Sequence, residues 1–336
     1  MTGPDQPRCP LDAMHGQVVG ILRRTFQRRR PDGALPRFFH EKSHGCLRGT
    51  FRVEPPVDPA LRQGLFAVPA EYPALVRFSS GMMADDREPD TRGLGIKLSG
   101  VPGPVCDGAP AGQQDFLMIS QPAIPTRDVT EAVEYFGKID GARAITPLTA
   151  LVPSYLMPGF RPWRTRWQYL ALIMAAIRAH LRGWDLARLT YYGVTPYRLG
   201  EGAMLYRCQP DPATFARRRP RGRSFAERLQ ATLDDGPLAF DFLIQPRQGE
   251  TDPLDRIGVP WTGPLLRVAR LEIPPQSVSA LLPTGDRLTM SPWNALKAHE
   301  PLGSINALRR TVYHASATDR GADPLFPTTL SPRGEV

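Results

Sequence analysis

A short segment near residue 40 carries side chains that could do two kinds of chemistry. His40, Glu41 and His44 fit the pattern H-E-x-x-H, in which two histidines bind zinc and the glutamate is the general base of a hydrolase. His40 also lies three residues after Arg37 and two before Lys42, an arrangement with a second interpretation that needs no zinc. The two interpretations require different local structures, because the zinc site demands a helix.

The residues around this segment disfavour that helix. Pro36 lies four residues before His40, Gly45 directly follows His44, and a strand-like pattern comes soon after. Proline and glycine at these positions oppose a helix of several turns. A third zinc ligand would have to come from a distant part of the chain. A zinc hydrolase that uses His40, Glu41 and His44 therefore stays the less favoured alternative.

Most of the chain is built from short elements that must position these residues. Helical patterns occur over residues 14–30, in a region from about 128 to 190, and over residues 302–317. Strand-like runs bounded by Gly, Pro and Asp occupy residues 50–53, 74–78, 93–98, 115–120, 203–207, 238–244 and 266–273. This order predicts an α+β fold, in which an antiparallel barrel or sandwich is accompanied by helices.

The composition is that of an ordinary globular protein, with 41% hydrophobic and 22% charged residues. The net charge of +9 comes almost wholly from arginine. We interpret it as surface charge and expect no nucleic-acid partner, because no nucleic-acid-binding motif appears. The four cysteines are far apart, as in a reducing compartment, and the N-terminus lacks the apolar region of a signal peptide. We expect a cytoplasmic protein without a transmembrane span.

Several segments, taken in order along the chain, resemble the haem catalase family. Arg37, His40 and Lys42 match the spacing around the distal histidine, which that family carries on a strand. Arg309 and Tyr313 match the Arg-x-x-x-Tyr spacing of its proximal iron ligand. The other similar segments are 75–80 (LVRFSS, like V-R-F-S-T), 90–97 (DTRGLGIK, like D-x-R-G-F-A-V-K), 115–128, and 192–195 with 203–207 (like the Y-G-S-H-T strand pair).

The resemblance covers about residues 35–316 and is closest to small catalase-like proteins that lack the C-terminal extensions of the large catalases. It implies an antiparallel eight-stranded β-barrel with a helical insertion and a C-terminal helix. It also implies three regions: an N-terminal helical arm (1–34), a haem-binding barrel domain (35–316) with the insertion at about 128–190, and a C-terminal tail (317–336). The implied cofactor is haem b.

The resemblance assigns the cofactor-binding residues. Tyr313 would bind the iron as a phenolate, and Arg309, one helical turn before it, would donate to the phenolate oxygen. Such help is needed because a free phenol has a pKa near 10. Arg37 and Arg77 would neutralise the haem propionates.

The resemblance also assigns the residues on the peroxide side of haem. His40 would move protons between the two peroxide oxygens, and Ser79 would orient its imidazole. His44 has the same strand parity as His40, so it stays a second candidate for this role. Ser120 stands where the large catalases place an asparagine, so the amide is missing and a weaker hydrogen bond replaces it.

These assignments imply a haem-dependent hydroperoxidase that cleaves hydrogen peroxide or an organic or lipid hydroperoxide through a ferryl intermediate. Its electron donor is unknown. The alternative on the same fold is a non-enzymatic haem- or lipid-binding barrel protein. We expect a monomer or dimer, because the chain has no obvious long N-terminal arm for interlocking subunits.

Overall fold

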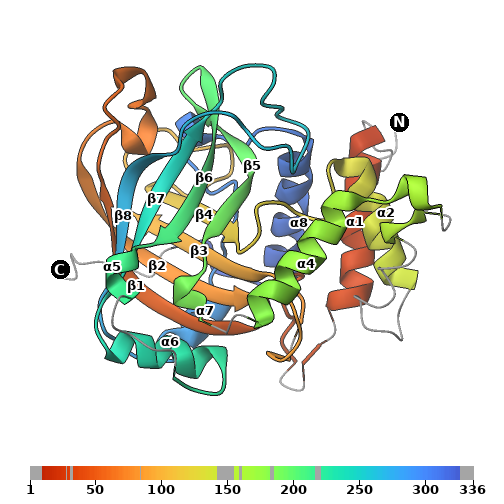
Figure 1. Ribbon diagram of the computed structural model, residues 1–336, viewed down its shortest axis with the longest axis horizontal. Coiled ribbons are helices and arrows are strands. Elements are labelled where there is room, and N and C mark those ends of the chain that lie inside the picture. Colours follow the sequence, from red (N-terminus) through yellow and green to blue (C-terminus); the bar gives the residue numbers. More distant parts are fainter. Residues whose placement is uncertain are drawn as a thin grey trace, which may run out of the picture.

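The computed structural model describes residues 10–27, 29–30, 33–83, 85–141, 155–158, 161–181, 185–215 and 221–325. At its centre eight antiparallel strands follow one another in chain order and close into a barrel (Figure 1). They are β1 (Ser43–Val53), β2 (Ala70–Ser80), β3 (Arg92–Ser99), β4 (Gln113–Ile119), β5 (Tyr191–Leu199), β6 (Gly202–Pro210), β7 (Leu238–Pro246) and β8 (Leu266–Ile273). The barrel closes where Thr50–Val53 of β1 pair with β8. The prediction of an antiparallel eight-stranded barrel in an α+β fold is confirmed.

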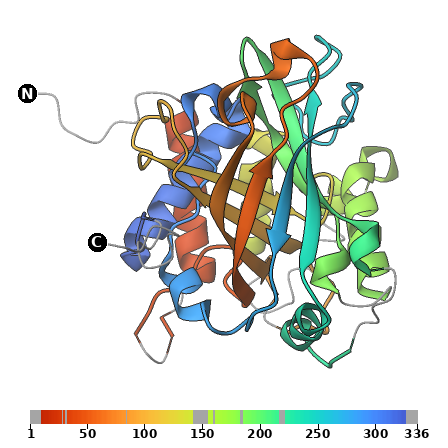
Figure 2. The ribbon, with the colours of Figure 1, turned by 90° about the vertical axis from the view of Figure 1, so that its left-hand side faces the viewer.

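Helices cover one side of the barrel. α1 (Pro10–Phe26), α2 (Val129–Gly141), α4 (Trp167–Leu181) and α8 (Ser304–Arg320) gather at the right of Figure 1, while α6 (Phe225–Asp234) lies across the lower end. Figure 2 shows the red α1 beside the blue α8, and the two helices are in contact. The shorter helices are α5 (Pro212–Phe215) and α7 (Leu282–Arg287). No helix in the described part of the chain is long and apolar enough to cross a membrane.

The C-terminal helix α8 confirms the prediction of a helix near residues 302–317 and extends it. It begins after Gly303, whose φ is +85°, and ends at Gly321, whose φ is +59°. A left-handed glycine at this position lets the backbone turn back onto the last carbonyls, here those of Ala317 and Thr318. The helix therefore runs to Arg320, past residue 316 where the barrel domain was expected to end.

Aromatic side chains fill the interior of the barrel. Phe51, Phe116, Tyr206 and Phe242 are all buried, and their ring centres lie 4.7–5.9 Å apart in neighbouring pairs. Rings at these distances, in stacked, tilted and edge-on contacts, form a packed core. The space for a ligand therefore lies outside the barrel, on the face that the helices cover.

Strand alternation decides which residues face those helices. On β2, Val76 and Phe78 belong to the core inside the barrel, so Arg77 and Ser79 point to the opposite side. On β3, Leu94 and Ile96 likewise face the barrel core, so Gly93, Gly95 and Lys97 face outward. Polar residues in the strands thus reach the space between barrel and helices.

A buried ion pair ties β3 and β4 to the segment before α8. Lys97 Nζ lies 2.8 Å from Asp115 Oδ1, and both side chains have no exposed surface. Asp115 Oδ2 also accepts hydrogen bonds from the backbone N–H of Ser291 and from the side-chain amide of Asn294, each at 2.9 Å. These bonds replace the hydrogen bonds to water that the carboxylate loses on burial. They also fix the chain where it leaves the barrel wall toward α8.

Candidate functional site

A cavity of about 350 Å³ lies between the outer face of the barrel and the covering helices. Its size falls in the range of ligand-binding pockets, roughly 300–1,000 Å³. Most of the predicted site residues line it: Arg37, His40, Arg77, Ser79, Arg309 and Tyr313. They come from the segment before β1, from β2 and from α8. The remaining lining is mainly apolar and includes Leu117, Leu172 and Val312 among others.

His40 sits in a strained position at the cavity wall. It lies just before β1 rather than on a strand. Its backbone φ is +55°, a value that residues other than glycine rarely adopt. Its backbone N–H donates to the carbonyl of Gly81 at 2.8 Å, and its Nδ1 lies 3.1 Å from Ser79 Oγ. A backbone bond and a side-chain bond thus hold the imidazole in a single place.

The electrostatic surroundings keep His40 uncharged. Burial lowers its pKa to about 3, and the positive charges of Arg77, Arg37 and Arg309 act in the same direction. A neutral imidazole at pH 7 is able to accept a proton at its free nitrogen. Among the bonds found in the described residues, Ser79 is the partner at Nδ1 and none involves Nε2.

Gly93 on β3 makes room for this imidazole. A Cβ at residue 93 would lie 2.4 Å from His40 Nδ1 and 2.7 Å from Ser79 Oγ. Both distances are far below ordinary van der Waals contact, so no larger residue fits without moving the pair. Gly93 lies in the segment 90–97 that resembles the catalases, but the resemblance assigns it no function.

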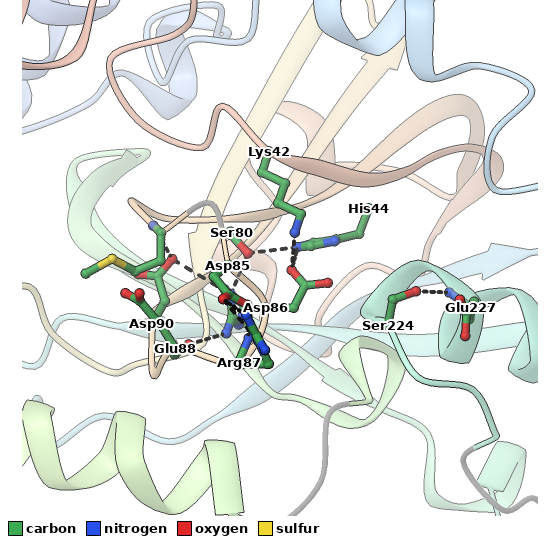
Figure 3. Close-up of polar contacts among 12 residues, drawn as sticks. Lys42, His44, Ser80, Asp85, Asp86, Arg87, Glu88, Asp90, Ser224 and Glu227 are labelled. Carbon is green, nitrogen blue, oxygen red and sulfur yellow. Dashed lines mark hydrogen bonds and ion pairs between the residues drawn. The ribbon is translucent and has the colours of Figure 1, made fainter. Parts of the chain in front are cut away.

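His44 points to a different part of the molecule. Its Nε2 lies 2.8 Å from Ser80 Oγ and 3.9 Å from Asp86 Oδ1, while Lys42 also pairs with Asp86 (Figure 3). Its ring centre is 5.0 Å from that of Phe225 on α6. Burial is the largest influence on this imidazole and lowers its pKa to about 4. His44 is not among the residues that line the cavity in the described part of the chain.

The parity argument for His44 fails because the backbone between the two histidines is irregular. The pairing of β1 with β2 shifts register between Ser43 and Gly45, and His40 has a left-handed backbone. Both features break the alternation of a regular strand. The two histidines therefore face different surroundings despite their spacing of four.

Ser120 also lies outside the cavity lining of the described residues. Its hydroxyl accepts a hydrogen bond from the backbone N–H of Arg92 at 3.0 Å, and its own N–H donates to the carbonyl of Arg92 at 2.8 Å. These bonds continue the pairing between β3 and β4. Ile119, one residue earlier, lines the cavity instead.

Three arginines converge at one end of the cavity. Arg37 and Arg77 were predicted for this site, and Arg320, from the last turn of α8, joins them. Burial lowers the pKa of all three, to about 10 for Arg320, and Arg77 further lowers the other two. The facing carboxylate is that of Asp286, 3.5 Å from Arg77 Nη2. Three guanidinium groups beside one carboxylate suit a ligand with acidic groups.

One of these arginines has an unused donor. Arg77 is only 4% exposed, and one of its terminal nitrogens donates to the carbonyl of Glu41 at 3.0 Å. Its Nε is buried without a hydrogen-bond partner among the described residues. Since buried donors are nearly always paired in folded proteins, this atom indicates a missing acceptor.

Tyr313 and Arg309 lie one turn apart on α8. The guanidinium carbon of Arg309 is 5.6 Å from the centre of the Tyr313 ring. Arg309 Nη1 donates to Thr195 Oγ1 at 2.7 Å and to Asn306 Oδ1 at 3.1 Å, which fixes the guanidinium in place. Burial opposes its charge, but the phenols of Tyr197 and Tyr313 outweigh this and raise the pKa of Arg309.

The arrangement needed for a zinc hydrolase does not form here. Residues 40–44 are not helical, and Glu41 pairs with Arg30 at 2.9 Å. The imidazoles of His40 and His44 bind two different serines, as described above. Within the described ranges, no group of three or more His, Cys, Asp and Glu side chains is placed to hold a metal ion.

Comparison with solved structures identifies the fold. A fungal catalase superposes with a TM-score of 0.64 at 14% sequence identity, over 95% of this chain and 64% of that protein. A bacterial catalase superposes with a TM-score of 0.60, also at 14% identity, over 100% of this chain and 66% of that protein. The fold is catalase-like. This chain thus spans slightly less than two thirds of the length of either catalase. No model of a known protein family and no curated protein matches the sequence.

Proposed function

We propose that this catalase-like protein is a haem-dependent hydroperoxidase related to the haem catalases, with haem b as its cofactor. One observation carries the proposal: His40 and Tyr313, from opposite ends of the chain, line the same cavity. A neutral proton acceptor and a phenol at one cavity are the two groups that peroxide chemistry on a tyrosine-ligated iron requires.

The residues at the cavity fit haem. The unpaired Nε of Arg77 and the nearby Arg37 and Arg320 suit the two propionates, which are carboxylates. Gly93 and Gly95 leave room on the barrel wall for the side chains of His40 and Met290, because a Cβ at residue 95 would lie 2.6 Å from Met290 Sδ. The apolar lining from α8 suits a macrocycle whose faces are apolar.

Each polar side chain then has a distinct task. Bound haem supplies an iron that activates the O–O bond of a hydroperoxide. Tyr313 would be the protein ligand of the iron, and Arg309 supplies the positive charge that an anionic tyrosine oxygen needs. His40, neutral at pH 7, accepts a proton from the hydroperoxide and returns it to the leaving oxygen. Ser79 holds the imidazole through Nδ1 and so leaves Nε2 for this transfer.

Hydrogen peroxide and organic hydroperoxides are both candidate substrates for this chemistry, and an electron donor completes the turnover. A haem- or lipid-binding protein without enzymatic activity is the second candidate. The position of Ser120 favours it, because that hydroxyl binds the backbone of Arg92 and does not line the cavity in the described chain.

A visible spectrum of the protein produced with adequate haem supply tests the proposal. We expect a Soret band of a tyrosinate-ligated haem, which Tyr313→Phe should abolish or shift. Tyr72→Phe is the matched control, because Tyr72 is buried at the barrel and does not line the cavity. A Tyr313→Phe protein with full haem content and an unchanged spectrum would refute the ligand assignment.

A second variant separates the enzyme from the carrier. His40→Gln should keep haem bound, because Tyr313 and the arginines are untouched. It should lower hydroperoxide consumption by about 100-fold or more, the usual size of a general acid–base contribution. If the wild-type protein binds haem but consumes hydroperoxide only at the rate of free haem, the carrier function is the correct one.

A further inference from the structure

Helix α4 is apolar around most of its circumference. Its sequence, WQYLALIMAAIRAHL, contains one arginine and no acidic residue. Tyr169 and Leu172 are buried and line the cavity, so they form the inner face. When the outer side of a surface helix is apolar too, that side normally packs against another apolar surface, such as a partner protein or a membrane.

The outer side of α4 exposes large apolar groups. Trp167, Ala171, Met174 and Arg178 are all exposed and follow one another at spacings of four, three and four, so they form one stripe along the helix. Trp167 is 71% exposed and Met174 is 40% exposed. Trp163, in the turn before the helix, is 79% exposed. We call Trp163 and this stripe the α4 outer face.

Arginines surround the α4 outer face. Arg161 and Arg164 flank Trp163 and are exposed, and Arg178 ends the stripe. Arg166 differs, because it turns inward to bind Glu134 of α2 at 2.6 Å and lies 4.0 Å from the ring of Tyr155. That contact anchors the start of α4 and leaves the two tryptophans on the outside.

We propose that the α4 outer face docks onto an anionic phospholipid surface. Tryptophan is the side chain that best suits a membrane–water interface, because its large ring is apolar and its N–H is polar. Arginine near the tryptophans adds attraction to anionic headgroups, in keeping with the net charge of +9. α4 has 15 residues, too few to span a bilayer but enough to lie in its surface. This docking concerns the outside of α4 and does not depend on haem.

The docked orientation would bring the cavity close to the lipid. Tyr169, Leu172 and Ile173 on the inner side of the same helix line the cavity. Only helix α4 would then separate an apolar hydroperoxide in the bilayer from the cavity. This link between docking and substrate, unlike the docking itself, rests on the proposed function.

Vesicle co-sedimentation of the full chain tests the docking. We expect the wild-type protein to bind vesicles made of phosphatidylcholine and phosphatidylglycerol in equal parts, and to bind pure phosphatidylcholine far more weakly. The double variant W163S/W167S should bind the anionic vesicles at least about tenfold more weakly, because two large rings no longer enter the interface. Brominated lipids should quench the tryptophan fluorescence of the wild type and not that of this variant.

Matched variants distinguish binding through the α4 outer face from nonspecific binding of exposed apolar or basic side chains. V57S/V68S removes two side chains that are 92% and 62% exposed elsewhere, and should leave vesicle binding unchanged. R164Q should weaken binding about fivefold, whereas R48Q on β1, also an exposed arginine, should have little effect. Circular dichroism of each variant checks that the fold is intact.

Three results would overturn the proposal. The first is a wild-type protein that does not bind anionic vesicles even at low salt. The second is an equal loss of binding in V57S/V68S and W163S/W167S. The third is a dimer, measured by analytical ultracentrifugation, that W163S/W167S dissociates without any change in vesicle binding, since the face would then join two copies of this chain.

Discussion

Replacing Gly93 with alanine would place a methyl group where His40 and Ser79 meet. The new Cβ would lie 2.4 Å from His40 Nδ1, 2.5 Å from its Cε1 and 2.7 Å from Ser79 Oγ. Ordinary contacts of a Cβ begin at 3.4 Å, so the imidazole must move by about 1 Å. The hydrogen bond of 3.1 Å between the two side chains would be lost or badly bent.

The displacement predicts a specific loss of activity. A misplacement of about 1 Å in a reacting group costs roughly 100-fold in rate, so kcat/KM for a hydroperoxide should fall by about that factor. Overpacking of this kind lowers the free energy of unfolding by about 1–3 kcal/mol. Haem content should not change, because the nearest neighbours of the new Cβ are His40 and Ser79 and not Tyr313 or the arginine cluster of Arg37, Arg77 and Arg320. The measurements are steady-state turnover of the haem-loaded protein, its haem content, and its thermal unfolding.

The control is Gly202→Ala on β6, where the nearest atom would lie 3.6 Å from the new Cβ. That variant should match the wild type in turnover and haem content. The reasoning is refuted if Gly93→Ala retains the wild-type kcat/KM, or if its crystal structure shows His40 and Ser79 still at their present distance. Either result would mean that the wall of the cavity tolerates the methyl group without moving the imidazole.

Three further predictions concern stability and ligand binding. Burial lowers the pKa of His299 from 6.5 to about 4. Between these two pH values the imidazole is protonated in the unfolded chain but not in the folded protein, so the free energy of unfolding falls as the pH drops from 6.5 toward 4. In urea titrations His299→Gln should reduce this slope by about 1.4 kcal/mol per pH unit, and an unchanged slope would contradict it. Lys97→Met should cost about 3–5 kcal/mol of unfolding free energy by leaving the buried Asp115 without its cation. K97M/D115N should recover part of this loss, because the asparagine carries no charge and its oxygen can still accept the hydrogen bonds from Ser291 and Asn294. Arg320→Leu should weaken haem binding about tenfold to 100-fold, while haem dimethyl ester, which has no carboxylates, should bind both proteins alike.

The sequence was sufficient to predict most of the fold. The strands near residues 74–78 and 93–98 show in the sequence because an apolar residue at every second position must face the barrel core. The helix α8 shows because Ile305, Leu308 and Val312 repeat with helical spacing and are all buried. These patterns are local, so they survive in a single sequence even though no family model matches it.

The sequence also predicted which polar residues gather at the cavity, with two exceptions among its candidates. Arg37, Arg77, Ser79, Arg309 and Tyr313 line it together with His40. The exceptions are Ser120, which belongs to the pairing of β3 with β4, and His44, which binds Ser80 and does not line the cavity.

Only the tertiary structure separated His40 from His44. Spacing alone makes the two equivalent on a regular strand, but a register shift and a left-handed residue break that regularity. Such irregularities arise from the pairing of β1 with β2, which depends on residues that are far away in the sequence.

The roles of Gly93 and Arg320 likewise come from contacts between distant segments. A glycine in a strand does not itself reveal that an imidazole from another segment will lie against it. Arg320 stands seven residues after Tyr313, on the same side of α8, but this spacing matters only if the helix continues that far, and Gly321 is what ends it. The residue types and their order thus determined the barrel and the chemistry available to it, because hydrophobic alternation is local. The choice between two histidines and the completion of the arginine cluster required the three-dimensional structure, because those contacts join parts of the chain that no sequence spacing connects.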